Sequence, residues 1–236
     1  LNGVLQTTER DEFIYHEMLA HLPLISHGKA RQILIIGGGD GGMLEEVLKH
    51  EIVEKVTLVE IDAGVINISK RYLRSICGDA FEDPRANIII SDGVRHVERT
   101  NDRYDAVIVD STDPIGPGEI LFTERFYKAC KRVLAPGGIL VTQNGVPFVQ
   151  GNELHNTMVA LKPLFGDTSC YTATVPAYVG GCMAFGWATD NTDLRTVSLK
   201  ELERRYAVAK LDTRYYTPAV HQAAFALPPY IAELIR

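Results

Sequence analysis

The chain has 236 residues, 46% of them hydrophobic, which is enough to bury the core of one substantial domain. Its formal net charge of -6 at pH 7 leaves no basic surplus for nucleic acid and favours cationic small molecules as ligands. Because no apolar run reaches membrane-spanning length and no signal peptide opens the chain, we expect a cytoplasmic protein without membrane contact.

The first predicted element is a helix within residues 7–24, where apolar residues recur at helical spacing. Thr8 and Asp11, three positions apart, resemble a capping box at the start of this helix. His16 and His21 are five positions apart, whereas two zinc-binding histidines on one helical face are four apart. The sequence therefore predicts a helix here but no metal site in it.

Five apolar, β-branched runs follow, most of them separated by helical patterns, at residues 32–37, 55–62, 87–93, 104–111 and 137–145. This alternation predicts βαβ units around a buried parallel sheet. Residues 153–164 then favour a helix, and residues 169–175 and 182–189 flank a glycine pair as an edge hairpin. We therefore predict an α/β fold with a doubly wound, mostly parallel, seven-stranded sheet. This is the Rossmann-like sheet of adenosylmethionine-dependent methyltransferases, here with C-terminal capping helices.

A glycine-rich turn, residues 37–42, follows the first strand, at the edge of the sheet where ligands bind in open α/β folds. Gly37, Gly39 and Gly42 have the G-x-G-x-x-G spacing that lets a nucleoside approach the backbone. Glu60 ends the second strand roughly 20 residues further on, where an acid hydrogen-bonds ribose hydroxyls. The turn and the acid together predict a nucleoside site.

Acids also end the third and fourth predicted strands. Asp92, followed by Gly93, could accept a hydrogen bond from an adenine amino group or could cap the next helix, and both roles can hold at once. Asp110 would be costly to bury without a partner, whereas Asp113 could simply begin a turn. Asp40 could complement the dipole of the helix after the glycine turn.

Each of these acids has a local structural explanation, but none of these explains why several acids should gather in one place. Asp40, Asp110 and Asp113 would meet in one crevice beside the nucleoside site and would repel one another unless a cation lies between them. The sequence therefore predicts a ligand that carries an amine at each end.

The chain resembles the polyamine aminopropyltransferases, and within them the bacterial spermidine synthases, in "QTTERDEFIYHEML", "LIIGGGDGG", "LVEID", "DPR", "DG" and "DSTDPIGPGE". The resemblance implies aminopropyl transfer from decarboxylated S-adenosylmethionine to putrescine, giving spermidine and methylthioadenosine, with no metal or further cofactor. It also implies a homodimer. In that family a small β-rich domain precedes the catalytic one. We expect residues 1–236 to form a single catalytic domain, with residues 1–6 a remnant of the smaller one.

On the family's pattern Asp110 is the catalytic acid-base residue, Asp113 anchors the diamine, and Asp40 faces the amine of the aminopropyl group. The channel for the polyamine is lined by Tyr15, His16, Gln143 and Tyr178. The donor-binding residues are predicted to be Gln6, Gly37, Gly39, Glu60, Asp92, Gly93 and Pro117. Two positions depart from the family: Asn2 stands for aspartate in "LDG", and Ala177 for threonine in "PTY". Neither changes the implied reaction.

Four alternatives stay open. An amine N-methyltransferase on the same fold would transfer a methyl group instead. Within the family, the acceptor could be spermidine, cadaverine or agmatine, because loop shape sets the size of the amine pocket. A catalytically silent nucleoside-binding module would not need Asp110 and Asp113. A nicotinamide dehydrogenase would share the glycine turn and Glu60 but leave the acids after the third and fourth strands unexplained.

Overall fold

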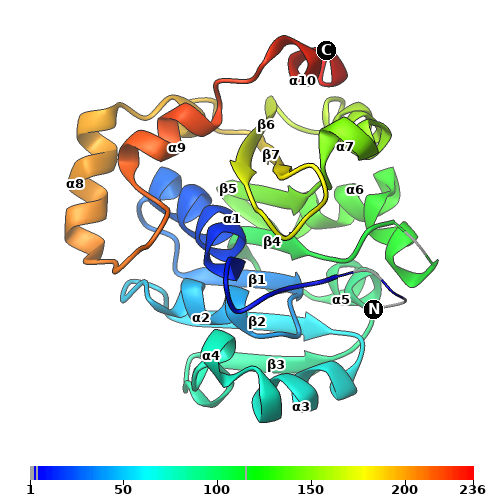
Figure 1. Cartoon of the computed structure of the whole chain (residues 1–236), viewed down its shortest axis with the longest axis vertical. Helices are drawn as coiled ribbons and strands as arrows, with labels where there is room; N and C mark the ends of the chain where they lie inside the picture. The colour runs from blue at the N-terminus through cyan, green and yellow to red at the C-terminus, as the bar shows by residue number, and fades with distance from the viewer. Residues whose placement is uncertain (1–2, 4, 115) are drawn as a thin grey trace.

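The computed structural model describes residues 3, 5–114 and 116–236. One seven-stranded sheet runs through the molecule in the order β3-β2-β1-β4-β5-β7-β6 (Figure 1). Its strands are β1 Gln32–Gly37, β2 Lys55–Glu60, β3 Ala86–Ile90, β4 Tyr104–Asp110, β5 Leu134–Gln143, β6 Asp167–Thr174 and β7 Cys182–Thr189. Strands β1 to β5 pair in parallel, while β7 runs antiparallel to both β5 and β6. The predicted doubly wound sheet and its edge hairpin are confirmed.

Helices cover both faces of the sheet (Figure 1). They are α1 Glu12–His27, α2 Gly42–Leu48, α3 Ala63–Tyr72, α4 Arg74–Cys77, α5 Gly93–Arg99, α6 Glu124–Val133, α7 Pro147–Leu161, α8 Leu199–Ala209, α9 Pro218–Ala224 and α10 Pro229–Leu234. Short 3-10 segments are η1 Ala80–Glu82, η2 Gly116–Phe122 and η3 Leu194–Thr196. Among the described residues, no helix combines the length and apolar character that a membrane span requires.

Strand β1 shows why the central strands are apolar along their whole length. Ile33 and Ile35 belong to the core cluster under α1 and α2, and Leu34 and Ile36 to the cluster under α5, α6 and α7. Successive side chains of a strand point to opposite faces, so a sheet covered on both sides needs apolar residues at every position.

The predicted capping box of α1 is wrong. The helix begins after Asp11, which takes the N-cap position and makes no side-chain cap hydrogen bond. Instead, one of its carboxylate oxygens accepts the Thr8 hydroxyl, and the other accepts the backbone N–H of Ala177. The Asp11 carboxylate, which the sequence spacing assigned to the capping box, therefore bonds to the loop between β6 and β7.

Helix α7 also differs from the predicted range of 153–164. It begins at Pro147, whose ring presets a helical φ for the first turn, and it ends at Leu161. At Gln150 the backbone leaves the helical region, with φ -125° and ψ 31°, so a kink separates the first turn from the rest. The apolar pattern in the sequence predicted only the regular part of α7 that follows the kink at Gln150.

A buried carboxylate on α1 fixes the C-terminal part of the chain to this helix. Glu17 is 1% exposed and accepts the backbone N–H groups of Arg214, Tyr215 and Tyr216 at 2.7, 2.8 and 2.7 Å. Hydrogen bonds to a charged acceptor are stronger than those between neutral groups. Glu17 therefore ties α1 to the segment between α8 and α9.

We expect Glu17→Ala to lower the free energy of unfolding by about 3 kcal/mol or more, because three N–H groups, including that of buried Tyr216, lose their charged acceptor. Urea denaturation followed by circular dichroism measures this change. Glu203→Ala is the control, since Glu203 is exposed on α8 and should change stability by less than about 0.5 kcal/mol. Equal losses for the two variants would contradict the role given to Glu17.

Candidate active site

The glycine turn after β1 lies directly against the end of β4. Gly37 pairs with Asp110 in the parallel register, and the Gly38 N–H donates to the Asp110 carbonyl oxygen at 3.0 Å. Gly37 has φ +84°, and a Cβ there would stand 2.0 Å from that same carbonyl oxygen. Only glycine allows this approach, which sets Asp40 of the turn beside Asp110.

Three of the predicted site residues converge at this point. His16, Asp40 and Asp110 each place one nitrogen or oxygen atom within 4.8 Å of the other two. Asp40 Oδ1 accepts the Gly42 N–H at 3.0 Å, and its Oδ2 lies 3.6 Å from His16 Nε2. The group can surround a small cation, either an ammonium or a metal ion.

Helix α1 supplies the aromatic side of this group. Tyr15 and His16 are 6% and 2% exposed, and the Tyr15 hydroxyl donates to Asp110 Oδ1 at 2.7 Å. One turn earlier, Glu12 Oε2 lies 2.7 Å from His16 Nδ1. A Cβ on Gly42 would stand 2.3 Å from His16 Cε1, so the turn needs glycine where the ring packs. Glu12 was not among the predicted site residues, although its i,i+4 spacing to His16 is visible in the sequence.

The charges of the group separate the pKa values of its two acids. Burial and the nearby charge of Asp40 raise the pKa of Asp110 to about 6, against smaller opposing effects of His16 and Tyr15. Burial alone would raise the pKa of Asp40, but His16 and the Gly42 N–H lower it below its usual value. Burial would likewise lower the pKa of His16, yet Asp40, Glu12 and Asp110 raise it well above its usual value. At neutral pH the site therefore holds an ionised Asp40, a protonated His16 and an Asp110 close to its titration range.

Glu60 lies at the carboxyl end of the neighbouring strand, as predicted. It is 8% exposed, and its Oε1 accepts the Asp62 N–H at 3.0 Å. Burial raises its pKa, and the backbone N–H groups of Asp62, Ile61 and Gly39 partly offset this effect. A Cβ on Gly39 would stand 2.8 Å from Glu60 Oε2, so the acid and the glycine turn are in contact. These two features of the predicted nucleoside site are brought together.

The capping role of Asp92 is confirmed. It is the N-cap of α5, and its Oδ1 accepts the N–H groups of Val94 and Arg95 at 2.8 and 3.3 Å. Gly93 begins the helix, where a Cβ would stand 2.5 Å from a methyl carbon of Ile36. Contact of this corner with an adenine stays a prediction. Two further predictions, on Asn2 and on the side chain of Pro117 in η2, lie outside the described residues.

Tyr178 and Gln143 border the group from the hairpin side of the sheet. The rings of Tyr178 and Tyr15 meet edge to face at 6.2 Å, and the Tyr178 hydroxyl donates to the Gln6 carbonyl oxygen at 2.8 Å. Gln143 ends β5, is 3% exposed, and accepts the Gly145 N–H at 2.8 Å. The N-terminal segment is thereby joined to the same wall of the site.

Asp113 follows β4 in the loop before η2 and is half-buried. Burial and the charge of Asp113 raise the pKa of Glu153 on α7 to about 7. Glu153 Oε1 accepts the Gln150 side-chain amide at 3.1 Å, and its Oε2 is buried without a hydrogen bond. The sequence offered no signal for Glu153, because its position depends on how α7 packs beside the loop.

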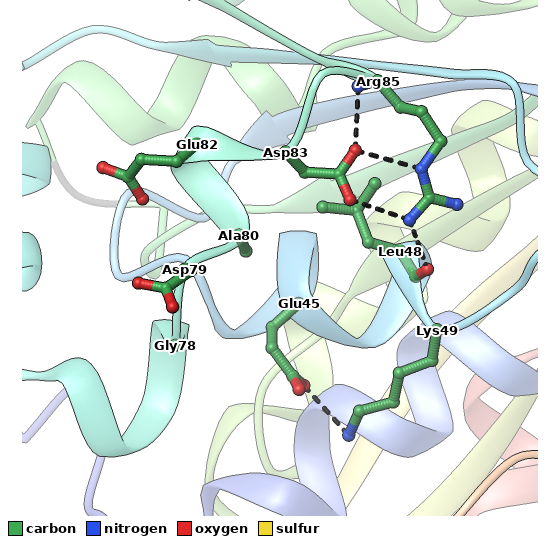
Figure 2. A pocket seen from close by; sticks show the side chains of 9 residues that line it. All are labelled: Glu45, Leu48, Lys49, Gly78, Asp79, Ala80, Glu82, Asp83 and Arg85. Carbon is green, nitrogen blue, oxygen red and sulfur yellow. Dashed lines mark hydrogen bonds and ion pairs between the residues drawn. The ribbon is translucent and has the colours of Figure 1, made fainter.

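Figure 2 shows a separate open pocket of about 440 Å³. Four of its charged residues form two ion pairs: Glu45 with Lys49 at 2.9 Å, and Asp83 with Arg85 at 2.9 Å. Arg85 also donates to the Leu48 carbonyl oxygen at 2.8 Å, near the end of α2. None of the predicted site residues that the structure describes lines this pocket, and its ion pairs are explained by the packing of α2.

Comparison with known proteins assigns the chain to a family. Residues 12–200 match the spermine/spermidine synthase domain. The chain is 58% identical over 99% of its length to a polyamine aminopropyltransferase of Ruegeria sp., covering 82% of that protein. It is 53% identical over its whole length to polyamine aminopropyltransferase 1 of Pseudomonas aeruginosa, again covering 82%.

Two solved structures are also similar to it, and each is matched over the whole of this chain. One is a spermidine synthase in complex with the transition state analogue AdoDATO, with a TM-score of 0.93, 38% identity and 79% of that chain covered. The other is a spermidine synthase from Thermotoga maritima, with a TM-score of 0.90, 36% identity and 78% covered. The fold, the domain match and these relatives agree, and the chain belongs to the spermine/spermidine synthase family as a polyamine aminopropyltransferase.

Proposed function

We propose that this enzyme transfers the aminopropyl group of decarboxylated S-adenosylmethionine to putrescine and releases spermidine and methylthioadenosine. The observation that carries the proposal is the convergence of Asp40, Asp110 and His16 within 4.8 Å at the end of a nucleoside-type glycine turn, where burial and the charge of Asp40 raise the pKa of Asp110 to about 6. A related spermidine synthase has been crystallised with the transition state analogue AdoDATO. That ligand supports a donor of the same class here.

The donor lies, in this proposal, along the carboxyl ends of β1, β2 and β3. The glycine turn admits the nucleoside, Glu60 accepts hydrogen bonds from the ribose hydroxyls, and Asp92 with Gly93 borders the adenine. Asp40 receives the ammonium at the end of the aminopropyl group. A carboxylated donor would bring a second anion to this point, and Asp40 would repel it.

The acceptor amine must lose a proton before it can attack. An alkylammonium has a pKa near that of lysine, about 10.4, so removing its proton near neutral pH costs roughly 4 kcal/mol. Asp110 accepts this proton, and the freed nitrogen attacks the carbon next to the sulfonium in line with the bond to sulfur. A C–N bond forms as the C–S bond breaks, and the sulfur leaves as a neutral thioether. The hydrogen bond from Tyr15 holds Asp110 in place.

The far ammonium of the acceptor is held, in the same proposal, by Asp113, beside the channel walls formed by Tyr178 and Gln143. We propose that the reaction uses no metal or further cofactor, because the sulfonium is already an activated leaving group. We also propose that residues 1–236 act as one catalytic domain in a homodimer, as the family resemblance implies. The cytoplasmic location stays a prediction.

The acceptor is tested by incubating the enzyme and decarboxylated S-adenosylmethionine with putrescine, cadaverine, agmatine or spermidine, and measuring product mass. We expect putrescine to give the highest kcat/KM and a product heavier by one aminopropyl group. A methylated product would establish the N-methyltransferase alternative.

The same incubation is repeated after chelation of divalent metals, and we expect no change in rate. A thermal shift with methylthioadenosine but no turnover with any amine would favour the silent nucleoside-binding module. A higher kcat/KM for another amine would reassign the acceptor and leave the donor assignment intact.

We expect Asp110→Asn to lower kcat by about 10²- to 10⁴-fold, because the amide cannot take the acceptor's proton. Its affinity for methylthioadenosine, measured by calorimetry, should change little, since that product carries no amine. A kcat equal to that of the parent would remove Asp110 from the catalytic role.

The pKa of Asp110 also predicts the acid side of the pH profile. Because the ionised form is the base and the pKa is about 6, kcat/KM of the parent enzyme should fall progressively as the pH drops below about 6. Tyr15→Phe removes a hydrogen bond that favours the ionised carboxylate, so it should move this fall to higher pH.

We expect Asp40→Asn to weaken binding of the decarboxylated donor by roughly tenfold or more, because its ammonium loses a charged partner. The same variant should narrow the preference for this donor over ordinary S-adenosylmethionine. Calorimetric titration with both donors measures the ratio of the two affinities. An unchanged ratio would mean that Asp40 acts mainly on the helix dipole.

A further inference from the structure

Glu12 lies one helical turn before His16 on α1 and takes no part in the reaction described above. Its Oε2 is 2.7 Å from His16 Nδ1, and the side chains of Glu12 and His16 are 12% and 3% exposed. A carboxylate at this distance accepts a hydrogen bond, so Nδ1 must carry a hydrogen. The other ring nitrogen, Nε2, is then the atom that faces Asp40 Oδ2 at 3.6 Å.

The ring of His16 is also held by packing. Gly42 leaves room for it with no side chain of its own, and a Cβ there would stand 2.3 Å from Cε1. The Tyr15 ring meets it edge to face, with 5.3 Å between the ring centres. The direction of Nε2 is therefore set by Glu12, Gly42 and Tyr15 together.

Among the described residues, the charged groups with the largest effects on His16 are acidic. They come from its own helix, from the glycine turn, from β4 and from α2: Glu12, Asp40, Asp110 and Glu46. Burial lowers the pKa of His16, but Asp40, Glu12 and Asp110 raise it well above its usual value. In the ligand-free enzyme both ring nitrogens therefore carry a proton at neutral pH.

The ammonium of the donor would enter beside Asp40, where the protonated Nε2 already points. Two cations next to one carboxylate repel each other, and the repulsion is strong in an enclosed site. The imidazole can remove this repulsion by losing one proton. Because Glu12 holds the proton on Nδ1, the proton that leaves is the one on Nε2.

We propose that Glu12 is a positioning residue that makes His16 exchange its Nε2 proton for the ammonium of the donor. The inference rests on the proposed function. When the donor binds, the Nε2–H bond breaks and the proton passes to the solvent. The freed lone pair of Nε2 then accepts a hydrogen bond from the ammonium, while Nδ1–H continues to donate to Glu12.

Proton release on binding tests this exchange. Decarboxylated S-adenosylmethionine is titrated into the whole enzyme by calorimetry near pH 8, where Asp110 is ionised, in buffers of different ionisation enthalpy. Methylthioadenosine, which has no ammonium, is the matched ligand. We expect protons to be released when the donor binds and about none when methylthioadenosine binds. Affinity for the donor should rise with pH while the free imidazole titrates.

Three variants test whether the released proton comes from His16. His16→Gln has no titratable ring, so donor binding should continue without proton release. Glu12→Gln keeps an acceptor for Nδ1 but removes the negative charge, so fewer protons should be released than by the parent. Glu9→Gln is the control, because Glu9 is exposed and its carboxylate bonds to Ser75, and release should match the parent.

Equal proton release with the two ligands, or undiminished release from His16→Gln, would overturn the proposal. Undiminished release from Glu12→Gln would remove Glu12 from the positioning role. These outcomes differ from a failure of the proposed function, in which the decarboxylated donor would not bind or would not be consumed in the presence of putrescine. A histidine ¹⁵N spectrum of the donor complex gives a second readout, in which Nδ1 should be protonated and Nε2 not.

Discussion

Negative charge gathered at the carboxyl ends of β1 and β4 is the constraint on which the rest of the site depends. Asp40 and Asp110 are brought together by the glycine turn, and both lose much of the solvent that would otherwise screen them. Such a pair is stable only with compensating donors or cations nearby. The protein supplies the Gly42 N–H, the Tyr15 hydroxyl and the His16 ring, and a cationic ligand can supply more.

Helix α1 supplies two of these groups, the Tyr15 hydroxyl and the His16 ring. The same helix is held in place by Glu17. Tyr15 and His16 face the acids and Glu12 contacts His16, while Glu17 binds three backbone N–H groups of the C-terminal segment. A site that depends on distances of a few ångströms needs such support from residues that touch no substrate. The C-terminal helices therefore contribute to the site through the helix that they hold.

Much of the site could be predicted because strand ends follow from local pattern. Glu60, Asp92 and Asp110 each close an apolar, β-branched run, and parallel strands place such ends along one edge of the sheet. Glu12 and Glu153 could not be singled out in the same way. A glutamate four residues before a histidine is common on helix surfaces, and Glu153 acquires its neighbours only when α7 packs beside the loop that contains Asp113.

The sequence by itself determined the strands, the glycine turn and the acids that follow them, because strand periodicity and turn chemistry involve residues close together in the chain. Only the tertiary structure decided which acid is ionised and which lies near its titration range. Asp110 has a pKa of about 6 because burial and the charge of Asp40 raise it, whereas His16, on a helix distant in sequence, and the Gly42 N–H lower the pKa of Asp40. Electrostatic interactions depend on separation in space and on burial, and neither can be read from spacing along the chain.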